Sequence, residues 1–371
     1  MFTKYLFYLR KSDWLLSLIA FFLVAFGMMG IYSSEATSAD SDLLNFKKQL
    51  VFFGIGIFLM IFFSLLDYRY LKTYGFVFYG LGIILLLFVL FFGTVVSGTK
   101  GWLVLFGDQV FQPVEIVKLV MIIILARFFS KWRSEVKSLK NLFIIFAVAG
   151  VLILLIFLQP DFGSAFILMA IFFGMLLLTK IKKVYVIWII IVVTIVSIFS
   201  WAFVLQDYQK NRVLTFINPD RDPYKSGYNI KQSIISVGSG QLFGRGLSLG
   251  PQSRLNFLPA QETDFIFAVI AEELGFIGSI FLIGLVVFLI YRLFNVSRLA
   301  RDDFGLFLVS GVIIYLFSQS LLNIGMNIGV LPIAGVPLPF VSYGGTSLLA
   351  SFMMLGIAQS VYIRRGVNAL G

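Results

Sequence analysis

Residues 142–158 read LFIIFAVAGVLILLIFL, and residues 162–179, just beyond the link Gln159-Pro160-Asp161, read FGSAFILMAIFFGMLLLT. Neither run contains a charged residue. An α-helix needs about 20 predominantly apolar residues to cross a bilayer, where its backbone must satisfy its own hydrogen bonds. We therefore expect each run to span a membrane as a helix.

Runs of this kind recur along almost the whole chain of 371 residues, of which 60% are hydrophobic and 13% are charged. No water-soluble domain needs so much apolar surface. The predicted fold is all-α, a polytopic transmembrane helical bundle that forms one domain over residues 1–371. The ten predicted spans are 14–32, 49–66, 74–93, 113–130, 142–158, 162–179, 184–205, 264–290, 304–325 and 343–363.

The basic residues indicate how the spans are oriented, because cytoplasmic segments of membrane proteins are rich in Lys and Arg. With the N-terminus in the cytoplasm, the segments on that side hold most of the basic residues, and the short outer loops hold few. Both termini are then expected in the cytoplasm, and the long polar segment 206–263 outside. We interpret the net charge of +11 as this topology signal beside anionic lipid, and not as a nucleic-acid surface.

The chain contains no Cys and no His. Disulfides, thiolate nucleophiles and metal sites built from Cys or imidazole are therefore excluded. Any proton transfer near neutral pH must use Asp, Glu, Lys or Tyr. Ionisable side chains in or beside a membrane span are costly, and they are functional candidates by default.

Two candidates lie at the starts of predicted spans. Glu115 and Lys118 are three residues apart, so they share a helix face and are expected to pair. The pair either stabilises the helix end or faces a cavity and orients a substrate. Asp161 stands where a helix N-cap belongs, and a cap is the favoured interpretation.

Asp264 falls where the long polar segment meets the eighth span. A functional role is favoured over a capping role, because Thr263 could cap the helix equally well. If the span is a continuous helix, Ala268, Ala271 and Gly275 lie close to the face of Asp264. Their small side chains would leave room for close helix packing or for a cavity.

Glu272 and Glu273 lie deeper in the same span and need partners, for which Lys or Arg of another helix is expected. The irregular stretch 327–345 must line protein or water if it lies at membrane depth.

The long segment 206–263 is predicted to contain an amphipathic helix over residues 230–237. The glycine-rich runs that follow it could offer backbone amides to a phosphate group. Arg212, Lys231 and Arg245 are the cationic candidates for binding an anion, with a solvated face as the alternative.

Five stretches in order carry a resemblance to a known family. They are FQPVEIVKL from residue 111, QPDFGSA from 159, NPDRDPYKSGYNIKQSIISVGSGQLFGRG from 218, LPAQETDFIFAVIAEELGFIG from 258 and GVLPIAGVPLPFVSYGGTSLL from 329. Together they resemble the SEDS family (shape, elongation, division and sporulation), from about residue 14 to residue 365. The run Gly-Val-Pro-Leu-Pro-Phe at 335–340 is most like the elongation branch.

The resemblance implies a peptidoglycan glycosyltransferase of the bacterial cytoplasmic membrane, which polymerises lipid II into glycan strands at the outer face. It implies a class B penicillin-binding protein as partner. The essential aspartate of the family falls on Asp264, its Glu and Lys of the fourth span on Glu115 and Lys118, and its QPD aspartate on Asp161. Asp264 would act as general base, and Arg212, Lys231 and Arg245 would hold the pyrophosphate of the donor.

The chain departs from the family pattern at three positions. Ala260 and Glu262 stand where Glu and His are usual, and Gly101 stands where Arg often precedes a Trp. The sequence identifies no certain cofactor, and a divalent cation held by carboxylates and pyrophosphate stays open, with no ligand set evident. A lipid II flippase and a non-catalytic scaffold are the alternative functions. Clustering of the candidate residues near one face favours surface chemistry over transport.

Overall fold

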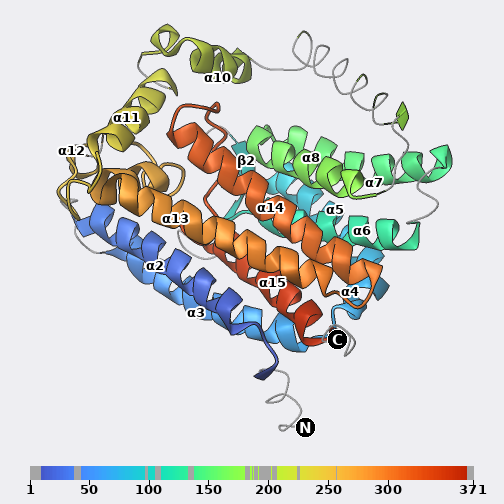
Figure 1. The fold of residues 1–371 in the computed structure, drawn as a ribbon. Coiled ribbons are helices and arrows are strands. Elements are labelled where there is room, and N and C mark those ends of the chain that lie inside the picture. The colour runs from blue at the N-terminus through green and yellow to red at the C-terminus, as the bar shows by residue number, and fades with distance from the viewer. Residues whose placement is uncertain are drawn as a thin grey trace.

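The computed structural model describes residues 10–36, 43–96, 99–104, 110–132, 138–179, 207–223, 226–255 and 257–365, with isolated positions between 184 and 202. The chain folds almost entirely into helices, as predicted (Figure 1). The helices are α2 (Trp14–Ala36), α3 (Leu44–Leu65), α4 (Arg69–Thr73), α5 (Gly75–Phe92), α6 (Val114–Lys131), α7 (Leu139–Phe157), α8 (Phe162–Leu177), α10 (Asp207–Ile217), α11 (Ser226–Ser239), α12 (Pro251–Arg254), α13 (Ile266–Arg298), α14 (Asp303–Asn327) and α15 (Gly345–Ile363).

The protein is a multi-pass membrane protein. Seven of its described helices are long and apolar enough to cross a membrane: α2, α3, α5, α7, α13, α14 and α15. Two more predicted spans are helices that fall outside this set: α8 is shorter, and α6 carries charged residues such as Glu115 and Lys118. The predicted span 184–205 lies almost wholly outside the described residues.

Two helices form the centre of the bundle. In their most apolar stretches, 72% of the residues of α14 and 83% of those of α15 are buried, against 17% for α3 and 22% for α5. The helix α14 packs against α6, α8 and α13, while α15 packs against α3 (Figure 1). The outer helices expose large apolar side chains such as Phe58, Ile84 and Phe91, as expected for surfaces that face lipid.

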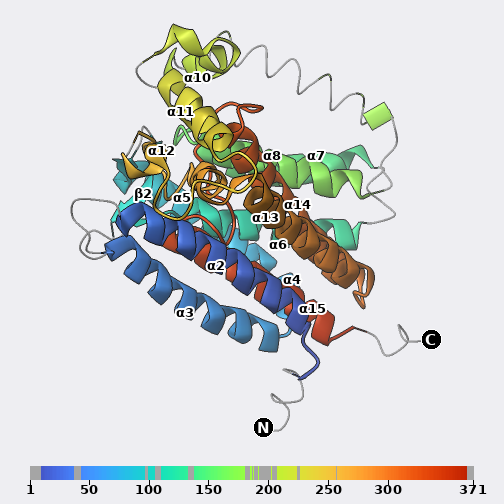
Figure 2. The same cartoon turned by 60° about the vertical axis from the view of Figure 1, so that its left-hand side comes forward.

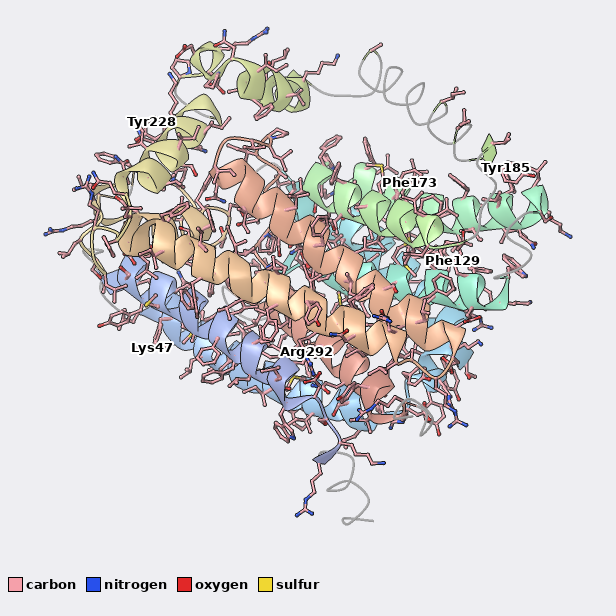
Figure 3. All side chains as sticks on the ribbon, in the orientation of Figure 1. Lys47, Phe129, Phe173, Tyr185, Tyr228 and Arg292 are labelled. Carbon is pink, nitrogen blue, oxygen red and sulfur yellow. The ribbon has the colours of Figure 1, made fainter. Side chains whose placement is uncertain are left out.

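The two ends of the bundle differ. The helices α10, α11 and α12 gather at one end, which we call the loop end (Figure 1). At the opposite end α2 begins and α15 finishes (Figure 2). There Asp13 donates its backbone N–H to Gln359 (2.9 Å) and pairs through its carboxylate with Arg292 (Figure 3). The described ends of the chain thus lie on one side, as two cytoplasmic termini would require.

A small antiparallel sheet between α5 and α6 was not predicted. Its strands β1 (Thr94–Val96), β2 (Thr99–Val104) and β3 (Val110–Phe111) pair in the order β1-β2-β3. The sheet is attached to the link between α7 and α8, because Lys100 donates its backbone N–H to the carbonyl of Gln159 (3.2 Å).

The prediction of a continuous helix after Asp264 is wrong, because α13 is interrupted at Gly275. This residue has a φ of 68°, a left-handed conformation that glycine adopts without steric cost. The loop 240–246 enters the break. The N–H groups of Phe276 and Ile277 donate to the carbonyls of Gln241 (2.8 Å) and Leu242 (3.2 Å). Gly275 therefore does not share a helix face with Ala268 and Ala271.

The same loop satisfies the other side of the break. Arg245 donates its backbone N–H to the carbonyl of Glu272 (2.9 Å), and Gly246 donates to that of Glu273 (3.0 Å). A broken helix at membrane depth needs such partners, because lipid supplies none. The backbone N–H groups of Arg245 and Gly246 are therefore used within the protein and are not available to a phosphate group.

Candidate active site

The predicted pair of Glu115 and Lys118 is fully buried between α6 and α14. The Nζ atom of Lys118 lies 2.7 Å from Oε1 of Glu115, and the side chains are 0% and 1% exposed. Lys118 also donates to Oε1 of Gln319 (3.0 Å), and the hydroxyl of Tyr315 donates to Glu115 (3.4 Å). The ion pair is thus part of an interior polar network, and it does not cap an exposed helix end.

This network continues along α14 as a row of polar side chains that the sequence analysis missed. Tyr315, Gln319, Asn323 and Asn327 follow one another at intervals of four residues, so they lie on one face of the helix. All four are buried. At 1.5 Å per residue the row extends over about 18 Å toward the loop end. The interval of four within an apolar span was the signal that could have revealed it.

Asp264 lies at the end of this row. Its backbone carbonyl accepts hydrogen bonds from the side-chain amides of Asn323 and Asn327, both at 3.0 Å. Its carboxylate lies against Gly335, where an added Cβ atom would be 3.7 Å from Oδ2. Phe265 occupies the N-cap position of α13, so neither Asp264 nor Thr263 is the cap.

The irregular stretch 328–344 closes over this turn. Tyr343 donates its N–H to the carbonyl of Glu262 (2.8 Å), and the hydroxyl of Ser342 donates to the carbonyl of Thr263 (2.6 Å). Gln319 donates to the carbonyl of Pro337 (2.9 Å). The irregular backbone is therefore satisfied by protein groups, as its predicted depth required.

Glu262, which departs from the family pattern, lies in a second acidic cluster beside the turn. It accepts a hydrogen bond from the side chain of Asn45 (2.7 Å). Glu35 accepts the backbone N–H groups of Asn45 (2.8 Å) and Phe46 (2.9 Å) at the start of α3. Burial raises the pKa of Glu262 to about 7, the hydrogen bond from Asn45 opposes this shift, and the charge of Glu35 adds to it.

Asp161 is the N-cap of α8, as predicted. Its Oδ1 atom accepts the backbone N–H of Ser164 (3.0 Å), and Oδ2 accepts from the side chain of Gln112 (3.4 Å). Gln112 is two residues ahead of α6, so the cap also links the starts of two helices.

The expectation that Lys or Arg of another helix pairs with Glu272 and Glu273 is wrong. Glu272 accepts the backbone N–H groups of Gln252 (2.9 Å) and Ser253 (3.1 Å), together with the hydroxyl of Ser253 (2.8 Å). Glu273 accepts from the hydroxyl of Ser33 and from the N–H of Ser248 (3.2 Å). Amides at the start of α12 and nearby hydroxyls thus solvate these acids.

Lys231 and Arg245, the two candidate cations of segment 206–263 whose side chains are described, are not drawn into the buried network. Lys231 forms an ion pair with Asp220, and both side chains are largely exposed. Arg245 is exposed at the break of α13. Arg212 belongs to α10, and its side chain lies outside the described residues. The predicted helix 230–237 is the longer α11, which contacts the site because Ser233 donates to the carbonyl of Asn327 (2.8 Å).

Carboxylates do not gather into a metal site in the described part of the chain, where no three acidic residues form a possible ligand group. The arrangement offers the half-buried carboxylate of Asp264 at the loop end, the buried cation of Lys118 deeper in the bundle, and a polar row between them.

A family described as cell cycle proteins, FtsW/RodA/SpoVE, matches residues 13–365. Peptidoglycan glycosyltransferase MrdB of Escherichia coli K12 is 39% identical over 74% of each chain. Peptidoglycan glycosyltransferase RodA of Treponema pallidum is 31% identical over 95% of this chain and 98% of its own.

Solved structures share the fold. One chain of a peptidoglycan synthase complex, studied for the coordination of polymerization and crosslinking, is similar with a TM-score of 0.79 and 28% identity. That match covers 95% of this chain and 97% of the other. The rod shape determining protein RodA of Thermus thermophilus is similar with a TM-score of 0.71 and 25% identity, over 95% of this chain and 97% of its own.

Proposed function

Because the chain belongs to the FtsW/RodA/SpoVE family of cell cycle proteins, we propose that it is a peptidoglycan glycosyltransferase that acts in cell elongation. Its substrate is lipid II, a disaccharide-pentapeptide on undecaprenyl pyrophosphate, which it polymerises at the outer face of the cytoplasmic membrane. The whole chain acts as one domain, with both termini cytoplasmic and segment 206–263 outside. The observation that carries the proposal is Asp264 itself, whose backbone carbonyl is held at the loop end by the polar row of α14.

Asp264 is the general base. The 4-hydroxyl of the acceptor GlcNAc attacks the anomeric carbon of the donor MurNAc, and Asp264 takes the hydroxyl proton in the transition state. The bond from the anomeric carbon to the pyrophosphate oxygen breaks, and undecaprenyl pyrophosphate leaves with the electron pair. Direct displacement converts the α-linked donor into a β-linked product without a covalent enzyme intermediate.

Cations assist the leaving group. Negative charge develops on the pyrophosphate as the glycosidic bond breaks, so a fixed cation stabilises the transition state more than the ground state. Arg212, Lys231 and Arg245 supply this charge from segment 206–263. Lys231 must exchange its partner Asp220 for the pyrophosphate. This exchange costs little, because an exposed ion pair contributes little to stability.

The buried pair of Glu115 and Lys118 stabilises the backbone around the base through Gln319. Lys118 reaches Gln319, whose amide holds the carbonyl of Pro337 in the stretch that covers Asp264. The pair thereby sets the shape of the site without touching the sugar. A class B penicillin-binding protein is the partner that crosslinks the product. This agrees with the likeness to one chain of a peptidoglycan synthase complex.

The test is polymerisation of labelled lipid II by purified protein, with and without the cognate transpeptidase. General-base catalysis contributes about 10²–10⁴ in rate, so Asp264→Asn is expected to abolish most of the polymer while the protein still folds. Asp161→Asn is the control, because Asn caps a helix about as well as Asp and should leave most of the polymer. Near-normal polymer from Asp264→Asn would refute the assignment, and movement of lipid II without joining would indicate a flippase.

A further inference from the structure

The backbone of Asp264 is held unusually well for a residue in a turn. A carbonyl oxygen has two lone pairs, and here the side-chain amides of Asn323 and Asn327 each donate to it at 3.0 Å. Both Asn side chains are 0% exposed. The carbonyl is therefore saturated by two donors that belong to the central helix α14.

Asn327 uses every part of its amide. Its Nδ2 donates to the carbonyls of Asp264 and Asn323 (2.8 Å), and its Oδ1 accepts the N–H of Ala268 (3.2 Å). The backbone carbonyl of Phe265, the N-cap residue of α13, also accepts that N–H (3.0 Å), so the two acceptors share it. Asn327 thus caps α13 from a neighbouring helix and holds the carbonyl of Asp264 at the same time.

Asn323 connects the same carbonyl to the covering stretch. Its Nδ2 donates to Asp264 and also to the carbonyl of Val336 (2.8 Å). Gly335, next to Val336, has a φ of 65° and faces the carboxylate of Asp264. The side-chain amides of Asn323 and Asn327 therefore fix the turn that carries the carboxylate of Asp264. They also fix its position relative to the covering stretch at Gly335 and Val336.

From this geometry we propose that Asn323 and Asn327 are positioning residues for the carboxylate of Asp264, an inference that rests on the proposed role of Asp264 as base. They touch neither sugar nor pyrophosphate. They act by fixing the peptide from which the carboxylate projects, and a misplacement of about 1 Å in such a group can cost about 10² in rate.

Asn327→Asp separates positioning from capping. The new side chain keeps an acceptor for the N–H of Ala268, but when ionised it has no donor for the carbonyl of Asp264. We expect a lower melting temperature at pH 8, because the ionised side chain is a buried charge without a cation. We also expect a KM for lipid II within about twofold and a kcat lower by about 10–100-fold. The activity of this variant relative to the unmodified protein should rise as the pH falls, because the protonated carboxyl group can donate again.

Two variants serve as controls. Ser320→Ala removes a buried hydroxyl of α14 that lies off the polar row, and it should leave kcat unchanged. Asn327→Leu removes capping and positioning together, so it should lower both the melting temperature and kcat. Full activity of Asn327→Asp at pH 8 would show that Asn327 is only a cap, and it would overturn the proposal.

A second measurement does not depend on catalysis. The chain contains no Cys, so Asp264→Cys introduces a single thiol at the position of the carboxylate. Its alkylation rate by iodoacetamide should change at least fivefold when Asn327→Asp is added. An unchanged rate would overturn the positioning role even if Asp264→Asn is inactive. Conversely, an active Asp264→Asn would refute the base, while the thiol still reports whether the two amides fix this turn.

Discussion

Lys118 is a charged side chain in the interior of a membrane bundle, and only its partners make this tolerable. Removing one member of a buried ion pair leaves the other charge uncompensated, at a cost of about 3–5 kcal/mol, whereas replacing both members by neutral groups is often much less harmful. We expect Lys118→Met to lower the melting temperature in detergent strongly, and the double change Glu115→Gln with Lys118→Met to restore much of it.

The exposed pair of Lys231 and Asp220 provides the matched control. Exposed ion pairs contribute about 0–1 kcal/mol, so Lys231→Met should leave the melting temperature nearly unchanged. A double variant that is less stable than Lys118→Met would contradict the view that the uncompensated charge, and not packing, causes the loss.

Glu262 predicts a pH dependence of stability. Because burial raises its pKa to about 7, the folded state binds a proton more tightly than the unfolded state. The stabilisation is complete below the unfolded pKa of about 4.3 and is lost as the pH rises through about 7. Glu262→Gln should therefore reduce the fall in melting temperature between pH 5 and pH 8. Asp220→Asn should not, and equal falls for all three proteins would exclude Glu262 as the source.

Individual residues were predictable where the partner is near in sequence. The pairing of Glu115 with Lys118 and the cap at Asp161 follow from local spacing, and both are confirmed. The partners of Glu272 and Glu273 were not predictable, because they are backbone amides of a distant loop. The two amide side chains around Asp264 carry no charge, so only their interval of four residues marked them within an apolar span.

At the scale of single elements, the break in α13 depends on glycine. Gly275 has a φ of 68°, and a Cβ atom there would lie 2.3 Å from the backbone nitrogen of Gly244. Gly275→Ala is expected to lower the free energy of unfolding by about 1–3 kcal/mol because of the backbone conformation alone. The clash of the added Cβ atom lowers it further. On the same helix, Gly284 has no atom within 4 Å of an added Cβ.

Gly284→Ala is thus the control, and it should be neutral or slightly stabilising. Thermal unfolding in detergent compares the two variants. Equal melting temperatures would mean that α13 can close into a continuous helix without the loop.

Elements were predictable to the extent that their apolar length decides them. The helices that lie close to predicted spans are α2, α3, α5, α6, α7, α8, α13, α14 and α15, because hydrophobic length is a property of the sequence alone. The break at Gly275 was missed because glycine in an apolar run is also typical of close helix packing. Whether it bends the chain depends on which segment fills the gap.

At the scale of the whole molecule, the topology can be tested directly. Asp220 near the loop end and Thr73 in α4 are both exposed, and single Cys changes can be introduced at each, since the chain has none. An impermeant thiol reagent added to intact cells should label Asp220→Cys and spare Thr73→Cys until the cells are opened. Labelling in the reverse order would invert the proposed orientation.

The interruption of α13 also has a consequence for how the chain folds while it is being synthesised. Synthesis proceeds from the N-terminus, so the loop 240–246 leaves the ribosome before the helix whose gap it fills. The intervening chain is short, and closing it costs little entropy. The exposed amides of the second half of α13 therefore meet their acceptors Gln241 and Leu242 as soon as they emerge. A rearranged gene that encoded this loop after α13 would leave a nascent span with unsatisfied backbone groups during its insertion.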